Sequence, residues 1–263
     1  MIAMVDNMKF LIWLAVLPSL IIGILIYKAD RMEKEPKKEL LKAFLFGVLS
    51  VVLTLIISSV FSITDANINS DDFFNVFIYS FFGIALIEEF SKWICSWMFL
   101  RKNKNFDYLF DGIVYVTFVS LGFATVENIL YTVSGGIFTG IIRAITTVPA
   151  HAFFGIVSGY YLSLAKKNRI TNNNLLKNRY LFLSIFIPFI LHGFYDFCLL
   201  TENEILFLVY ILFVIILYSV SISRVKKMMK MEERFVNNKK LYCSNCGMRV
   251  DTPYCSNCGK KID

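Results

Sequence analysis

The chain has 263 residues, of which 57% are hydrophobic and only 18% are charged. This composition lies outside the usual range for a soluble domain and is typical of a protein that crosses a membrane several times. The formal net charge of +7 is concentrated in particular loops, so it indicates membrane topology and gives no reason to expect a nucleic-acid partner.

Seven apolar stretches approach or exceed the roughly 20 residues that a helix needs to cross the hydrocarbon core. The first has neither a basic segment before it nor a small-residue cleavage site after it, which predicts a retained helix and not a cleaved signal. The sequence therefore predicts an all-α, polytopic transmembrane helical bundle of about seven spans. The expected spans are residues 10–27, 41–63, 73–100, 111–132, 137–165, 180–200 and 205–223.

Loop charges predict the orientation, because lysine and arginine near helix ends are retained in the cytoplasm. Six basic residues follow the first span, three follow the third and five follow the fifth, whereas the loops "TDANINSDD" and "TENE" have none. We therefore expect a multi-pass protein of the cell membrane with its N-terminus outside and its C-terminus in the cytoplasm. The basic segment 223–234 should contact lipid headgroups of the inner leaflet.

Two C-x2-C pairs, each followed by a glycine, lie near the end of the chain. Such pairs can hold one zinc ion in a closed site of four thiolates, and metal binding would supply most of the folding free energy of so short a segment. The alternative, two disulfides, does not suit the cytoplasm. We expect a bundle at 1–223, a basic linker at 224–240 and a structural zinc ribbon at 241–263. Its ligands would be Cys243, Cys246, Cys255 and Cys258.

Ionisable residues occur inside the predicted spans, where each costs roughly 2.5–3.5 kcal/mol at a helix centre unless it is paired. Helical spacing allows pairing, because Lys92 lies one turn from two glutamates and His192 lies one turn from Asp196. We expect one polar cluster between the bilayer midplane and the outer surface, with Arg143 at the outer interface. The residues concerned are Glu88, Glu89, Lys92, Glu127, Arg143, His151, His192 and Asp196.

Three short motifs carry a family resemblance. They are "EEFSK" at 88–92, "FATVE" at 123–127 and "HGFYD" at 192–196, in the order E-E-x-x-K, F-x-x-x-E and H-x-x-x-D. In these motifs the chain resembles the PrsW family of bacterial intramembrane proteases, which is distantly similar to the CAAX-processing and abortive-infection membrane proteases. The resemblance implies cleavage of a single-pass membrane protein, typically an anti-sigma factor, on its extracytoplasmic side as the first step of regulated proteolysis.

In a metal-free version of the mechanism, Glu88 takes a proton from the attacking water while Lys92 keeps Glu89 charged. Glu127 would complete the water site in this version. His192, oriented by Asp196, would stabilise the oxyanion or protonate the leaving amine.

A second version assigns the same groups to a catalytic metal, with Glu88 as the base. The expected ligands would be His192, Asp196, Glu127 and His151, although a lone histidine such as His151 is also common as a core residue. No H-E-x-x-H motif is present, so the sequence favours the metal-free version.

Acids and histidines inside spans also build proton relays, so a proton-coupled transporter or sensor is the alternative function. Transporters usually have related halves or helices broken by glycine and proline at matching places, and this sequence has neither. A membrane scaffold for a zinc ribbon would not need the ionisable groups. The sequence therefore favours a protease.

Overall fold

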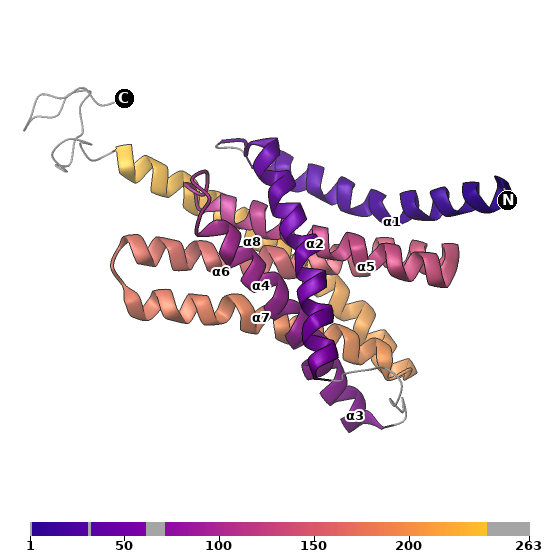
Figure 1. Ribbon diagram of the computed structural model, residues 1–263. Helices are drawn as coiled ribbons and strands as arrows, with labels where there is room; N and C mark the ends of the chain where they lie inside the picture. The colour runs from indigo at the N-terminus through magenta and orange to yellow at the C-terminus, as the bar shows by residue number, and fades with distance from the viewer. Residues whose placement is uncertain (1, 31–32, 62–71, 241–263) are drawn as a thin grey trace, which may run out of the picture.

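The computed structural model describes residues 2–30, 33–61 and 72–240. All regular structure in these residues is helical, which confirms the all-α prediction there. The zinc-ribbon prediction lies outside the described residues. In chain order the elements are α1 (Ile2–Ala29), α2 (Lys37–Val60), α3 (Phe73–Ile78), the π-helix η2 (Tyr79–Ala85), α4 (Leu86–Leu100), α5 (Phe110–Ile145), α6 (Thr147–Ile170), α7 (Asn174–Leu200) and α8 (Glu204–Lys240) (Figure 1).

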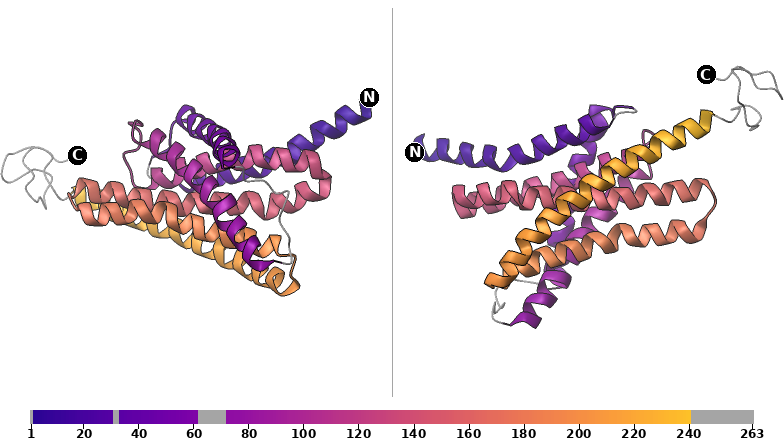
Figure 2. Two further views of the ribbon diagram at one scale, coloured as in Figure 1. Left: turned by 60° about the horizontal axis from the view of Figure 1, so that its bottom comes forward. Right: turned by 180° about the vertical axis from the view of Figure 1, so that it is seen from behind.

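Six helical segments of the described chain are long and apolar enough to cross a membrane, against the prediction of about seven. The difference arises in the fourth segment, Phe110–Ile170, whose apolar character is continuous over 61 residues. This segment folds back on itself near Gly136, where the backbone takes a φ of +80°. Its two arms run antiparallel through the middle of the bundle, and they are residues 110–135 of α5 and residues 137–170, which comprise the rest of α5 and α6 (Figure 2). They correspond to the predicted spans 111–132 and 137–165.

The crossing of α2 and α5 depends on two glycines. A Cβ atom on Gly47 would lie 1.9 Å from the carbonyl oxygen of Val119, and one on Gly122 would lie 2.1 Å from that of Phe44. Backbone cannot yield to such an approach as a flexible side chain can, so both positions require glycine. The close contact fixes α2 across α5, so that Thr54, Leu55 and Ser58 near the C-terminal end of α2 line a cavity of the bundle.

We predict that Gly122→Ala will lower the free energy of unfolding by about 1–3 kcal/mol, the usual cost of overpacking. Gly23→Ala is the matched control, because its Cβ would lie 3.4 Å from the ring of Phe118, close to an ordinary contact. Thermal unfolding of both variants in detergent checks this. A melting temperature of G122A at or above that of G23A would contradict the packing described.

The π-helical turn η2 directly precedes the glutamates of α4. Its wider turn places Phe81 against Gly193 of α7, where an added Cβ would lie 2.5 Å from the Phe81 ring. Phe81 also packs edge-on against Phe189, with ring centroids 5.8 Å apart. Turns of this kind are frequent at functional sites. Here η2 holds the beginning of α4 against α7, which brings the first and third motifs together.

Helix α8 extends to Lys240, so the residues predicted as a basic linker continue this helix. Its buried Glu232 accepts a hydrogen bond of 2.9 Å from the backbone N–H of Phe110, at the beginning of α5. A carboxylate at a helix N-terminus satisfies free N–H groups and suits the helix dipole. The basic loops after α1, α4 and α6 lie towards this end of the bundle, and α1 begins at the other (Figure 1).

Candidate active site

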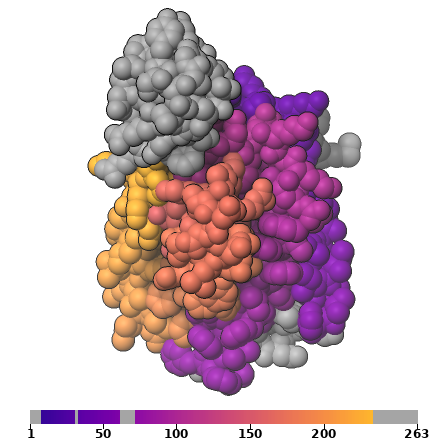
Figure 3. Space-filling view, turned by 90° about the vertical axis from the view of Figure 1, so that its left-hand side faces the viewer, coloured from indigo at the N-terminus to yellow at the C-terminus, as the bar shows by residue number. Residues whose placement is uncertain are grey.

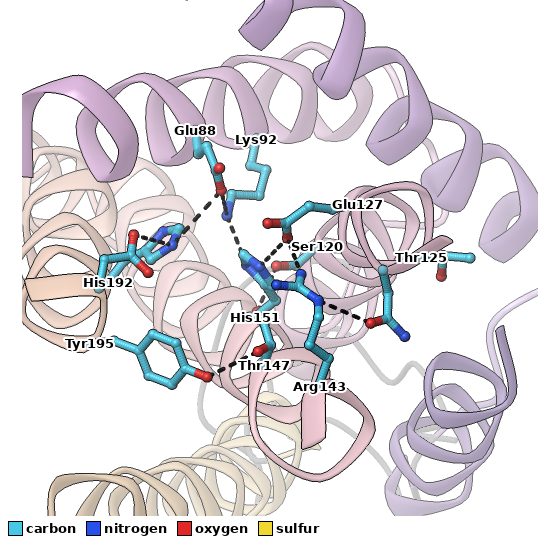
Figure 4. Close-up of polar contacts among 12 residues, drawn as sticks. Glu88, Lys92, Ser120, Thr125, Glu127, Arg143, Thr147, His151, His192 and Tyr195 are labelled. Atoms are coloured by element: carbon cyan, nitrogen blue, oxygen red, sulfur yellow. Dashed lines mark hydrogen bonds and ion pairs between the residues drawn. The ribbon is translucent and has the colours of Figure 1, made fainter. Parts of the chain in front are cut away.

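A cavity of about 570 Å³ lies among α2, η2, α4, α5, α6 and α7. Six of the eight ionisable residues predicted inside the spans line it, and Glu89 and Lys92 lie directly behind. The cavity is at the end of the bundle opposite the basic loops, because Ser58, Tyr131 and Leu199 line it near the corresponding ends of their helices. Its ionisable lining is Glu88, Glu127, Arg143, His151, His192 and Asp196 (Figure 4).

The first motif forms the contacts that its helical spacing predicts. The Lys92 Nζ atom lies 2.5 Å from Oε1 of Glu89 and 3.6 Å from Oε2 of Glu88. It also lies 4.5 Å from the ring centroid of Phe123, the first residue of the second motif. All three charged side chains are buried, so the ammonium group compensates the charge of the glutamates where water cannot.

His192 joins the third motif to the first. Its Nδ1 atom lies 2.9 Å from Oε1 of Glu89, and its Nε2 atom lies 3.2 Å from Oδ2 of Asp196 and 3.8 Å from Oε2 of Glu88. The ring stacks on Phe154, with centroids 4.9 Å apart. The histidine is thus fixed in orientation, with carboxylate oxygens at both ring nitrogens.

His151 joins the second motif to the first. The sequence had left open whether this histidine belongs to the site or to the core. Its Nε2 atom lies 2.7 Å from Oε2 of Glu127, and its Nδ1 atom lies 3.2 Å from the Lys92 Nζ. An ammonium group can only donate, so this network assigns the lone pair to Nδ1 and the proton to Nε2. A metal ion bound by His151 would therefore take the Nδ1 lone pair in place of the Lys92 ammonium group. The His151 and His192 rings pack edge to face, with centroids 5.1 Å apart.

Arg143 belongs to the same cluster, although the sequence favoured a place at the outer interface. Its Nη2 atom lies 3.2 Å from Oε2 of Glu127, and its Nε donates a 3.2 Å hydrogen bond to Oδ1 of Asn128. The guanidinium carbon lies 4.1 Å from the ring centroid of Tyr131. The turn at Gly136 explains these contacts, because it brings the arm that carries Arg143 back alongside Glu127.

Three residues form a possible metal site. Glu88, His151 and His192 each offer a ligand atom within 4.8 Å of the others. One carboxylate oxygen and two imidazole nitrogens are a common ligand set of catalytic zinc. This set shares both histidines with the expected one, but it has Glu88 in place of Glu127 and Asp196.

Two carboxylate oxygens give independent support for a cation here. Within the described chain, Oε2 of Glu88 and Oδ2 of Asp196 are buried and accept no hydrogen bond, and both face Nε2 of His192. The Lys92 ammonium group lies 3.6 Å from Oε2 of Glu88, beyond hydrogen-bond distance. Such atoms are costly to bury unless a proton or a metal ion lies between them. The residues present therefore fit a divalent metal ion.

Sequence reasoning missed Tyr195, which also lines the cavity. Its hydroxyl group lies 3.1 Å from that of Thr147 and 3.0 Å from that of Tyr210. The only available signal was its position three residues after His192, which places both side chains on one face of α7.

A second group of buried carboxyls, Asp30, Glu35 and Asp111, lies towards the end with the basic loops. Tyr115 donates a hydrogen bond to Glu35, and Oδ2 of Asp111 accepts one of 2.6 Å from the backbone N–H of Tyr108. Burial raises the pKa of the Glu35 carboxyl. These contacts attach the loop after α1 to the beginning of α5, which is a structural role.

Carboxylates, imidazoles and an ammonium group surround a cavity inside an apolar bundle, an arrangement suited to hydrolysis inside a membrane. A family model described as PrsW family intramembrane metalloprotease matches residues 35–221. The chain belongs to this family and is a membrane-embedded peptidase, as the three motifs indicated. The family assignment therefore decides for a peptidase over the transporter or sensor that the sequence left as the alternative function. The bundle is accordingly that of a multi-pass membrane protein.

Relatives named Protease PrsW agree with the family assignment. The one from Oceanobacillus iheyensis is 37% identical over 210 residues, which cover 80% of this chain and 92% of the relative. The one from Clostridioides difficile is 34% identical over 237 residues, or 88% of this chain and 94% of the relative. The one from Bacillus subtilis is 35% identical over 173 residues, which cover 66% of this chain and 75% of the relative. No solved structure matches the chain.

Proposed function

We propose that this peptidase cuts a single-pass membrane protein, an anti-sigma factor, on the extracytoplasmic side as the first step of regulated proteolysis. Loop charges support this orientation, because the basic loops after α1, α4 and α6 would face the cytoplasm. The cavity lies near the opposite ends of the helices. Water reaches that depth more easily than the midplane, and hydrolysis needs both water and an extended substrate backbone.

The observation that carries the mechanism is the pair of buried carboxylate oxygens that face Nε2 of His192. Together with the ligand set of Glu88, His151 and His192, it favours the metal-assisted version over the metal-free version that the sequence favoured. The name of the family, a metalloprotease family, agrees. A bound metal would supply Lewis-acid polarisation of the scissile carbonyl and a more acidic water.

The remaining charged residues either hold other side chains in place or accept a proton. Glu127 and Asp196 are the cavity carboxylates outside this ligand set. Glu127 is assigned to take a proton from the attacking water, and Arg143 and His151 hold its Oε2 atom in place. Glu89 accepts from Nδ1 of His192 and so fixes the ring, while Lys92 keeps Glu89 charged.

The four cysteines of the C-terminal segment, outside the described residues, are proposed to bind one structural zinc ion. They are Cys243, Cys246, Cys255 and Cys258. The catalytic metal would be a second ion, so the metal content of the two sites can be measured separately.

Co-expression with candidate single-span anti-sigma factors, tagged at both ends, tests the proposal. Wild type and the surface control Glu204→Ala should give a truncated product, and Glu88→Ala should give none. Mass spectrometry of the fragment ends should place the cut outside the membrane or in its outer half. A new terminus on the cytoplasmic side of the substrate span would contradict the orientation, and equal cleavage by E88A would contradict the site.

A further inference from the structure

A second pocket lies at the end of the bundle that carries the basic loops, far from the candidate active site. Its volume is about 220 Å³, and it lies where the ends of α4 and α6 meet the beginning of α7. Figure 3 shows this end, where the salmon-coloured turn between α6 and α7 projects beside the end of α4. Its lining includes Trp97, Arg101, Phe106, Lys166, Arg169 and Lys177.

The lining contains four cations, Arg101, Lys166, Arg169 and Lys177, and no acid. Lys166 donates to the carbonyl of Phe106 and interacts with the charge of Glu232. Within the described chain the other three cations form no ion pair with an acid. Like charges that converge on one concavity repel one another, so the pocket has the electrostatic character of an anion site.

The rest of the lining is apolar and aromatic, which distinguishes the pocket from a simple basic patch. The guanidinium carbon of Arg101 lies 4.7 Å from the ring centroid of Trp97, whose ring stacks on Trp93 at 6.2 Å. Leucines of α4, α6 and α7 complete the apolar part. Cations and an apolar wall together match a phosphate joined to hydrocarbon.

We propose that this pocket binds the phosphate diester of an anionic phospholipid. The source would be the leaflet next to the basic loops, which is the cytoplasmic leaflet in the orientation that the proposed function assumes. Basic pockets between transmembrane helices on that side are suited to acidic headgroups. A free phosphate would use the cations but would leave the apolar wall uncovered, so the lining favours the lipid.

The position of the pocket gives the lipid a role in the active site. The three helices that form it are those that supply the proposed metal ligands, since α4 carries Glu88, α6 carries His151 and α7 carries His192. Each ligand lies roughly 20 Å along its helix from the pocket. A headgroup that holds the three helix ends together therefore restrains the spacing of the ligands.

Thermal unfolding of the full-length protein in lipid nanodiscs tests this. With phosphatidylglycerol added to phosphatidylcholine, the melting temperature of wild type should rise by about 3–6 °C, the shift expected at ligand concentrations roughly tenfold above Kd. Arg169→Gln with Lys177→Gln should abolish the rise. Lys37→Gln with Lys38→Gln is the matched control, since it removes the same charge from exposed positions at the beginning of α2 and should leave the rise intact.

Inorganic phosphate added to phosphatidylcholine nanodiscs separates the two sources of the ligand. An equal rise with phosphate alone would overturn the lipid assignment. An equal rise in both double variants, or no rise in wild type, would overturn the pocket itself. Both leaflets of a nanodisc have the same composition and no cleavage is measured, so failure of the proposed topology or protease substrate would not affect this result.

Discussion

Glu88→Gln is expected to abolish cleavage of the co-expressed substrate and to reduce the metal content of the purified protein by one ion per chain. Glutamine preserves the size of the side chain but removes the negative charge that a divalent ion requires of a carboxylate ligand. Oε2 of Glu88 is one of the two buried carboxylate oxygens that face Nε2 of His192, so a neutral amide there also removes the charge that favours a cation.

Metal analysis of the full-length variants by mass spectrometry checks this result. Cys243→Ser with Cys246→Ser provides the reference for the zinc of the C-terminal segment and should lose one ion while cleavage continues. Glu204→Gln, on the exposed first turn of α8, should keep both metal and activity. If E88Q lost cleavage but kept its full metal content, Glu88 would act as a base and not as a metal ligand.

The contacts within single helices could be predicted from the sequence. Lys92 reaches Glu88 and Glu89, and His192 reaches Asp196, because a spacing of three or four residues places side chains on one face of a helix. These local pairs are also the parts of the motifs that carried the family resemblance.

Contacts between helices could not be predicted in the same way. The pairing of His151 with Lys92 and of His192 with Glu89 depends on how α4, α6 and α7 pack, which periodicity does not determine. The place of Arg143 depends on the register of the hairpin at Gly136. Sequence could show that these groups must be paired inside a membrane, but the choice of partners is a property of the folded bundle.

Composition did not show that the chain stays helical beyond residue 223. Residues 224–240, predicted as a basic linker, continue α8 as one helix. One face of that helix is buried at Met228 and Glu232, where Glu232 binds the beginning of α5. A single buried acid within a basic segment gives no periodic pattern, so the sequence contained little sign of this contact.

Glu127→Gln is expected to lower the rate of cleavage by about 10²–10⁴-fold, the usual contribution of a general base, while metal content stays at the wild-type value. The amide oxygen can still accept from Nε2 of His151 and from Arg143, which lie 2.7 and 3.2 Å from Oε2 of Glu127. The geometry is therefore kept and only the ability to take a proton is lost. Arg143→Lys, which keeps a cation beside the carboxylate, should cost less than E127Q.

Comparing the E88Q and E127Q variants is the decisive experiment, because the proposed roles of the two glutamates predict different effects on metal content and on cleavage. E88Q should lose metal and cleavage together, whereas E127Q should lose cleavage alone. Single-turnover cleavage of a purified substrate, measured beside metal content on the same samples, separates these outcomes. Cleavage by E127Q at the wild-type rate would place the base elsewhere in the cavity, and loss of metal from E127Q would make Glu127 a ligand, as the metal-assisted version drawn from the sequence expected.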